Sequence, residues 1–188
     1  MQEQAVRFIS EDEYLEQERV SSMKYEYFQG EVFAMAGASR KHNLIVSNVI
    51  TSLVTQLRKK PCRVYPSDLR LKISETGLYT YPDVMVVCGE EIFSDDKEDM
   101  LLNPDVIIEV LSESTEQYDR TTKFNHYRTL KSLKEYVLIS QTEKKIETHF
   151  KIEDHKWLFT ETGDHSGIIK LESIGCELRH DEIYDKVY

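Results

Sequence analysis

The chain is organised around residues 81–127, which read YPDVMVVCGEEIFSDDKEDMLLNPDVIIEVLSESTEQYDRTTKFNHY. Two apolar runs within this stretch, Val84–Cys88 and Val106–Leu111, have the length of buried strands. Each run carries one carboxylate, because Asp83 opens the first run and Glu109 lies inside the second. An ionised carboxylate in a strand core is costly unless it is ion-paired, hydrogen-bonded or bound to a metal. The stretch therefore predicts two strands that hold an acidic site.

A helical segment follows the second strand and carries Asp119, Lys123 and Tyr127 at spacings of i, i+4 and i+8, which places them on one helix face. Two strand carboxylates beside an amine indicate a divalent-metal site for phosphodiester hydrolysis. Neighbouring strands lie about 4.8 Å apart, so Asp83 and Glu109 can share one ion. Lys123 can orient the attacking water or stabilise the developing negative charge.

A purely structural explanation of the same residues stays open at this point. Glu109 can be ion-paired with Lys123 or an arginine, and Asp83 can cap a turn after Pro82. Lys123 can equally lie on a solvated helix face with Asp119 as its i, i+4 partner.

Composition restricts the class of protein. The chain has 188 residues, of which 40% are hydrophobic, so we expect a single domain over residues 1–188. The net charge of −10 repels polyanions and weighs against a passive nucleic-acid coat. Met1–Ser10 does not resemble a signal peptide and no apolar run is long enough to cross a membrane, so we expect a soluble, cytoplasmic protein without a membrane partner.

The cysteines predict no disulfide framework. Cys62, Cys88 and Cys176 are odd in number, widely spaced and without a CxxC pair. We therefore expect reduced thiols, most of them in the core, rather than a disulfide or a zinc site.

Periodicity and turn residues predict the secondary structure along the chain. Helices are expected over about residues 11–19, 39–58 and 116–129, with a closing helical turn at 181–187. Strands are expected at residues 24–28, 32–36, 62–65, 69–73, 81–87, 106–111, 135–140, 145–151, 156–161 and 168–171, and a surface loop or frayed helix at 90–99. This order predicts an α+β (mixed α/β) domain with a central mixed β-sheet flanked by helices.

Several motifs together resemble the Uma-type family of putative restriction endonucleases, in the PD-(D/E)XK nuclease superfamily. They are Tyr81-Pro82-Asp83-Val84, Ile108-Glu109-Val110-Leu111-Ser112, Ser114-Thr115, the Asp119/Lys123/Tyr127 set, Glu135-Tyr136, Tyr25-Glu26, Gly30-Glu31 and His42. The resemblance covers about residues 10–140. It implies a restriction-endonuclease-like fold, a Mg²⁺ (or Mn²⁺) site held by Asp83 and Glu109, and DNA as the substrate.

One departure from the superfamily pattern concerns the catalytic lysine. The E-x-K motif would place a lysine at position 111, where this chain has Leu111. In the Uma-type pattern the lysine stands on the following helix, at Lys123. A helix packed on the sheet can return its amine to the same place, so the resemblance implies a catalytic set of Asp83, Glu109 and Lys123.

Four further residues are candidates for the site. Glu31 follows a hairpin turn and is either a third carboxylate on the metal side or an exposed residue. His42 stands in the first turn of the long helix, where it can face the site, bind a phosphate or be structural. Asp119 is the helical partner of Lys123, and Tyr127 either packs over Lys123 or fills the core.

The leading hypothesis is a metal-dependent endodeoxyribonuclease. One alternative is a catalytically weak nuclease-fold protein that acts as a nucleic-acid or protein binding module. Another is a small-molecule-binding domain with purely structural carboxylates. The net charge of −10 favours the two alternatives, whereas the complete set of Asp83, Glu109 and Lys123 favours the nuclease. Nucleases of this size often cut both strands as symmetric dimers, so a homodimer is also expected.

Overall fold

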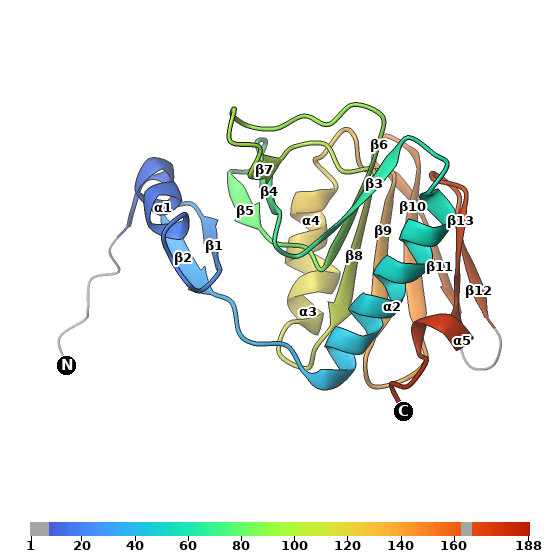
Figure 1. Cartoon of the computed structure of the whole chain (residues 1–188). Coiled ribbons are helices and arrows are strands. Elements are labelled where there is room, and N and C mark those ends of the chain that lie inside the picture. Colours follow the sequence, from blue (N-terminus) through green and yellow to red (C-terminus); the bar gives the residue numbers. More distant parts are fainter. Residues whose placement is uncertain (1–7, 163–166) are drawn as a thin grey trace.

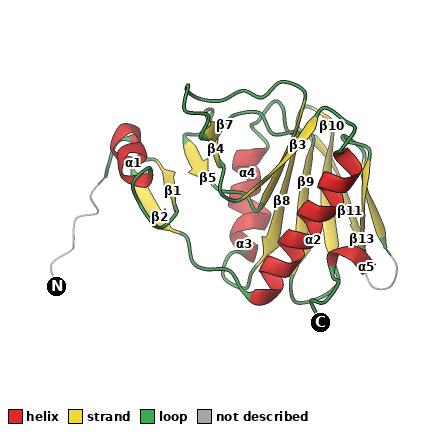
Figure 2. Cartoon of the chain, viewed as in Figure 1, coloured by secondary structure: helices red, strands yellow, loops and turns green. Residues whose placement is uncertain are grey.

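The structure is a computed structural model that describes residues 8–162 and 167–188. It confirms the predicted α+β class (Figures 1 and 2). The predicted single domain spans residues 1–188, and 1–7 and 163–166 of these lie outside the described residues.

The described strands form three sheets, and the largest is the expected central mixed β-sheet, with parallel and antiparallel pairs. The largest has the order β11-β10-β9-β8-β6-β3, with bounds Lys156–Thr162, Ile146–Glu153, Glu135–Ser140, Val106–Leu111, Val84–Cys88 and Cys62–Pro66. A second has the order β2-β1-β5-β4-β7, with bounds Glu31–Ala34, Tyr25–Phe28, Leu78–Thr80, Arg70–Ile73 and Met100–Leu101. The third pairs β12 with β13, at Ile168–Leu171 and Cys176–Arg179.

The helices lie on both faces of the six-stranded sheet (Figure 2). The long helix α2 covers one face, and the opposite face is covered by a helical segment of three parts: α3, the π-helical turn η1, and α4. Helix α1 precedes the first hairpin and α5 closes the chain. The bounds are α1 Glu11–Glu18, α2 Arg40–Leu57, α3 Glu116–Tyr118, η1 Asp119–Lys123, α4 Phe124–Tyr127 and α5 His180–Ile183.

The alternation of side chains along β8 divides the core between these two faces. Val106, Ile108 and Val110 pack in the cluster that contains the buried side of α2. Ile107 and Leu111 pack in the cluster that contains Tyr127 and Leu130 from the other side. Because the side-chain period of a strand is two, Glu109 shares the face of Ile107 and Leu111. The strand therefore directs Glu109 toward η1 and α4.

Helix α2 begins and ends close to the predicted bounds. Ser39 is its N-cap, and its side chain accepts a hydrogen bond from the backbone N–H of His42. The residues that face the sheet are spaced by four and are all buried, namely Ile45, Val49, Leu53 and Leu57. The cap fixes the first turn of α2, and with it the position of His42.

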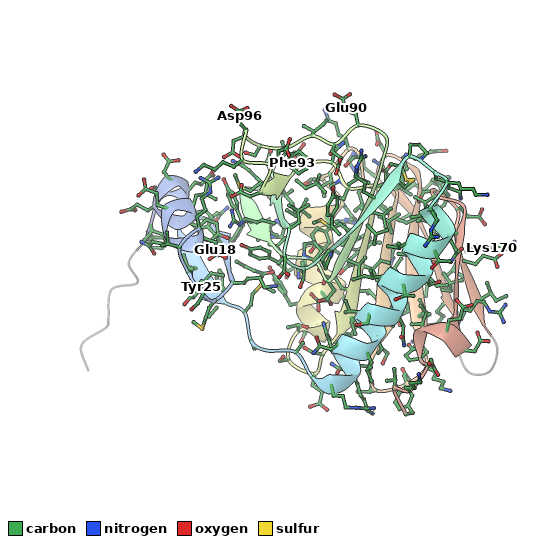
Figure 3. The ribbon with its side chains drawn as sticks, viewed as in Figure 1. Glu18, Tyr25, Glu90, Phe93, Asp96 and Lys170 are labelled. Carbon is green, nitrogen blue, oxygen red and sulfur yellow. A yellow bond between two sulfur atoms is a disulfide. The ribbon has the colours of Figure 1, made fainter. Side chains whose placement is uncertain are left out.

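The N-terminal unit of α1, β1 and β2 follows the predicted hairpin. Gln29 and Gly30 form its turn with φ values of 49° and 90°, the left-handed conformations that a two-residue hairpin turn requires. Figure 3 shows Glu18 and Tyr25 close together in this unit, where the Tyr25 N–H donates to Glu18 Oε1 at 3.2 Å. Tyr27 pairs with Tyr79 of β5 and joins the unit to the body of the molecule.

Some expected elements differ from the structure. The strand expected at residues 81–87 begins only at Val84, and a separate strand, β5, ends at Thr80, so that 81–83 form an irregular crossing between two sheets. Short pairing strands β5, β7 and β13 were not expected. Residues 90–99 are largely loop, and Figure 3 shows Glu90 and Asp96 pointing outward from it. None of the helices among the described residues is long and apolar enough to cross a membrane.

The expectation of three reduced thiols is wrong for two of them. Cys62 and Cys88 are directly opposite each other in the β3–β6 register and form a disulfide, while Cys176 is free and buried. The sequence separation of 26 residues gave no indication of this pairing, because the register of β3 against β6 brings the two residues together.

Reduction of this disulfide is expected to lower the free energy of unfolding by about 2–4 kcal/mol, because the reduced chain gains entropy in its unfolded state. Urea denaturation with and without dithiothreitol measures the difference. The double variant Cys62→Ser/Cys88→Ser should unfold like the reduced wild type and show no response to the reductant. Equal midpoints for wild type with and without dithiothreitol would instead mean that both thiols are reduced in the folded protein.

Candidate functional site

The strand register brings Asp83 and Glu109 together. Strands β6 and β8 are antiparallel with Val84 opposite Ile108. One further step in this register sets Asp83 opposite Glu109, on the same face of the sheet, and directly opposite side chains have Cβ atoms about 5 Å apart. The Asp83 N–H donates to Glu109 Oε2 at 3.2 Å, and the Val110 N–H donates to Asp83 Oδ2 at 2.8 Å. Both carboxylates are thus fixed by backbone hydrogen bonds as well as by the sheet.

Lys123 joins these carboxylates from the helical side. Its Nζ lies 2.9 Å from Glu109 Oε1 and 3.6 Å from Asp119 Oδ1. The residue is only 6% exposed, so the solvated helix face of the structural alternative is wrong, although the Asp119 partner is present. Burial acts against the positive charge, but Glu109 and the other nearby carboxylates outweigh it and raise the pKa of Lys123 well above 10.5. Lys123 therefore stays cationic.

For Glu109, unlike Lys123, the effect of burial outweighs the effect of the neighbouring opposite charge. Burial raises the pKa of this carboxyl to about 8, against the opposing effect of the Lys123 charge. The nearby charges of Asp83 and Asp119 add to the increase. The metal-free site therefore exchanges a proton near neutral pH.

A π-helical turn positions the helical side chains. Residues 116–129 were expected to form one regular helix, but Asp119–Lys123 form a π turn between α3 and α4. The Tyr136 hydroxyl donates to the Asp119 carbonyl oxygen at 3.0 Å, and thereby satisfies a backbone acceptor in this turn. Tyr127 does both things that the sequence left open, because its ring is buried in the core cluster and lies 6.0 Å from Lys123 Nζ. Its hydroxyl also donates to Glu109 Oε1 at 2.7 Å.

His42 reaches the site from α2, on the other face of the sheet. Its Nε2 lies 3.0 Å from Asp83 Oδ1, and both side chains are partly accessible to solvent. Burial disfavours the imidazolium, but the hydrogen bond to Asp83 and the charges of Asp83 and Glu109 outweigh it and raise the pKa of His42 above 6.5.

Glu26 is a site residue that sequence reasoning did not single out. Its Oε1 lies 3.5 Å from Lys123 Nζ and also accepts a hydrogen bond from the Thr80 hydroxyl. The alternation in β1 was the available signal, because Tyr27 packs in a core cluster and Glu26 must therefore face the other way. Glu31, the carboxylate chosen instead, is exposed at the start of β2 and has no recorded contact with the site among the described residues.

The oxygen donors of the site suit a small divalent cation. Mg²⁺ commonly binds to one or two protein carboxylates and completes its octahedron with water, and Asp83 and Glu109 offer two adjacent carboxylates. Residues 8–162 and 167–188 contain no group of three or more His, Cys, Asp or Glu side chains arranged to hold a metal. This donor set therefore fits a hydrated Mg²⁺ or Mn²⁺ ion better than a structural zinc, which prefers four protein ligands.

Two hollows in the surface lie elsewhere and do not include Asp83 or Glu109. One runs along α2 and α5, with Asn48, Gln56 and Glu182 in its lining. The other lies beside α1 and is lined in part by Tyr14 and Val32. The carboxylate site is thus separate from both hollows, and its partly accessible side chains are Asp83 and His42.

Solved and sequenced proteins resemble this chain over most of its length. A crystal structure described as that of "a putative nuclease belonging to DUF820" from Anabaena variabilis superposes with a TM-score of 0.78, covering 96% of this chain and 99% of that one. At 18% sequence identity this likeness concerns the fold. Two Synechocystis sp. proteins named uncharacterized, sll1609 and slr1290, are 39% and 37% identical over 155 and 177 residues. These alignments cover 82% and 94% of this chain, and 88% and 91% of the relatives.

The model of the Uma2 family, described as "Putative restriction endonuclease", matches residues 11–179 and so includes both strand carboxylates, the helical lysine and the N-terminal hairpin. This match confirms the resemblance deduced from the motifs, and the chain belongs to the Uma2 family of restriction-endonuclease-like proteins.

Proposed function

We propose that this protein is a Mg²⁺- or Mn²⁺-dependent endodeoxyribonuclease that hydrolyses phosphodiester bonds. The observation that carries the proposal is the meeting of Asp83, Glu109 and Lys123 at the adjoining ends of β6 and β8. The membership of a nuclease-like family supports the class of reaction. DNA as the substrate, the metal and the role of each residue are part of the proposal, and the expected homodimer and cytoplasmic location stay predictions.

Asp83 and Glu109 would hold the ion, which when bound would polarise a phosphoryl oxygen and lower the pKa of a water molecule. Lys123 keeps its proton at neutral pH, so it acts as a fixed positive charge for the phosphate and not as a general base. Tyr127 holds the Glu109 carboxylate in place by a hydrogen bond from its hydroxyl. His42, partly exposed and bonded to Asp83, can pass a proton between the site and solvent.

One observation favours the alternative of a catalytically weak protein that only binds its partner. Each oxygen of the two strand carboxylates already accepts a bond from the protein: Asp83 from His42 and the Val110 N–H, and Glu109 from Tyr127 and the Asp83 N–H. An internally satisfied site has less need of a cation. Binding of nucleic acid without metal-dependent cleavage would establish this alternative.

Removal of either strand carboxylate is expected to abolish cleavage. Asp83→Asn and Glu109→Gln keep the size of the side chain but remove the charge that holds the ion, so plasmid cleavage with Mg²⁺ or Mn²⁺ should fall at least about 100-fold. Glu31→Gln, which changes an exposed carboxylate of the β1–β2 hairpin outside the site, should stay within about two-fold of wild type. Thermal unfolding confirms that the variants are folded. Cleavage that survives chelation of the metal would eliminate the mechanism.

Lys123→Met is expected to affect both the chemical step and stability. Loss of the charge should lower single-turnover cleavage about 100-fold or more. It should also lower the metal-free stability by about 3 kcal/mol, because carboxylates remain buried without their cation, and added Mn²⁺ should restore part of it. Lys72→Met is the control, since Lys72 is paired with Glu11 at 3.1 Å, outside the site. If Lys123 is only structural, the folded fraction of Lys123→Met will cleave at the wild-type rate.

Metal affinity is expected to depend on the protonation of Glu109. Its pKa of about 8 means that a cation must displace a proton below this pH, so Mn²⁺ affinity should rise up to about ten-fold per pH unit and then level off. Calorimetric titrations between about pH 6.5 and pH 9, in buffers of different ionisation enthalpy, measure the affinity and the proton released.

The variant Glu109→Gln should bind Mn²⁺ more weakly and lose most of this pH dependence. Against the effect of burial, the hydrogen bond to Asp83 also raises the pKa of His42 above 6.5, so the variant separates the contribution of Glu109 from that of His42. Wild-type affinity that is constant between about pH 6.5 and pH 9 would contradict a protonated Glu109.

A further inference from the structure

An aromatic surface lies beyond the site, where α4 meets the edge of the six-stranded sheet. We define it as the aromatic face of Phe124, His149, Trp157 and Phe159. The ring of Phe124 lies 4.6 Å from that of His149 and 5.4 Å from that of Trp157, and the ring of His149 lies 5.2 Å from that of Phe159. Phe159 is 50% exposed, and the other three rings are partly exposed. A cluster of one half-exposed and three partly exposed rings indicates an interaction surface.

The strand register places this face on the same side of the sheet as the carboxylate site. His149 is opposite Tyr136, and Glu109 is opposite Leu138, two residues further along β9. Because alternate residues share a face, these side chains project to the same side. Phe124 stacks on Tyr136 at 5.0 Å, so packed rings connect the exposed cluster with the neighbours of Glu109. The aromatic face and the carboxylate site therefore lie on the same side of the sheet, joined by the packed rings of the helical segment α3–η1–α4 and β9.

The charges around the aromatic face complement a polyanion. The guanidinium of Arg128 lies 5.4 Å from the centre of the Phe124 ring. Lys131 follows in the chain, and after the larger effect of Lys151 its charge helps to lower the pKa of Asp154 in the β10–β11 turn. Among the described residues Arg128 forms no salt bridge with a carboxylate, whereas Lys131 is close enough to Asp154 to interact with it. Arg128 thus offers a positive charge beside the exposed rings, with Lys131 near the β10–β11 turn, in a protein with a net charge of −10.

The nearby carboxylates have other ion-pair partners, and Asp154 pairs with Lys151 at 3.0 Å. Glu147, which is buried beside His149, is ion-paired with Arg120 and also with Lys145. Burial lowers the pKa of His149, so its ring is neutral at pH 7 and can stack like the other rings of the cluster. Stacking platforms flanked by cations are the usual surface for unpaired bases, since every base offers a π face and a nearby phosphate.

We propose that the aromatic face binds unpaired bases of a single-stranded nucleic-acid segment, with a base stacked on Phe159 and Trp157, and with Arg128 and Lys131 at the phosphates. The choice of nucleic acid as the ligand rests on the proposed function. Unpaired bases are specified because the faces of bases within a duplex are already covered by their neighbours. The protein would then hold a frayed or single-stranded part of its substrate beside the site that acts on the backbone.

The single tryptophan of the chain, Trp157, provides a direct signal. We would titrate metal-free, full-length protein in EDTA with single-stranded oligothymidylate of about 12 nucleotides, a blunt duplex of that length, and an oligomer of the same backbone without bases. We expect oligothymidylate to quench Trp157 fluorescence and to bind at least about ten-fold more tightly than the other two probes. Anisotropy of a labelled probe gives the affinities independently.

The matched variants are Phe159→Ala and Leu158→Ala. These neighbours on β11 are 50% and 52% exposed, but they project from opposite faces of the sheet. Phe159→Ala should weaken oligothymidylate binding at least about five-fold, and Phe159→Tyr should retain it. Leu158→Ala should change oligothymidylate binding less than about two-fold, as expected for a surface substitution outside the aromatic face. Arg128→Gln should also reduce the salt dependence, by about 0.7 in the slope of log K against log [salt], whereas Phe159→Ala should leave the slope unchanged.

The proposal is overturned if oligothymidylate and the base-free oligomer bind equally, or if Phe159→Ala binds like wild type while melting normally. It is also overturned if Leu158→Ala and Phe159→Ala weaken binding equally, or if both change the oligomeric state measured by light scattering, because the surface then serves protein contacts. Failure of the proposed function is distinct from this result. Oligothymidylate binding without metal-dependent plasmid cleavage rejects the nuclease function and supports base binding at the aromatic face. Cleavage without oligothymidylate binding supports the nuclease function and rejects base binding at the aromatic face.

Discussion

The buried ammonium group of Lys123 is the interaction on which the site depends. It lies 2.9 Å from Glu109, 3.5 Å from Glu26 and 3.6 Å from Asp119, and these residues come from β8, the N-terminal hairpin and the π turn. One positive charge therefore connects β8 and the π turn with a hairpin that is distant in the sequence. With Asp83 beside them, four carboxylates surround one lysine and one histidine, so ionisation of all four leaves an excess of negative charge even when His42 is protonated. Burial is the main cause of the raised pKa of Glu109, the nearby negative charges add to it, and this excess of charge supports the proposal of a divalent cation at the site.

Such a cluster is a poor way to stabilise a fold. Moving ionised groups out of water costs several kcal/mol each, and replacement of a buried ion pair by apolar residues is often neutral or stabilising. The π turn adds to this cost, because it interrupts the regular hydrogen bonds of the helix, and Tyr136 contributes its hydroxyl to satisfy the Asp119 carbonyl. Since stability does not require these features, they favour a functional site over the purely structural alternative.

The sequence predicted those parts of the fold that depend on local pattern. Apolar spacing and the Ser39 cap predicted α2, and the apolar run at Val106–Leu111 predicted β8 to the residue. Parts that depend on pairing between distant segments were missed. β5 and β7 have only three and two residues and exist through their partners, so no local signal marks them. The same applies to the disulfide, since only the register of β3 and β6 sets Cys62 opposite Cys88. At the site, Asp83, Glu109 and Lys123 were recognisable, but the choice of Glu31 over Glu26 required knowledge of which hairpin face meets Lys123.

The net charge of −10 decides how such a protein can approach a polyanion. Long-range electrostatics oppose the encounter, so binding must come from short-range contacts or from neutralisation of the acidic cluster. A divalent cation at Asp83 and Glu109 would neutralise that cluster where a phosphate has to enter. Stacking on the aromatic face would supply affinity that does not depend on net charge, because base and ring interact through their π faces. A chain with these two features would therefore bind its substrate weakly along most of its surface and tightly only where the metal is bound and unpaired bases are available, which restricts cleavage to substrates that satisfy both conditions.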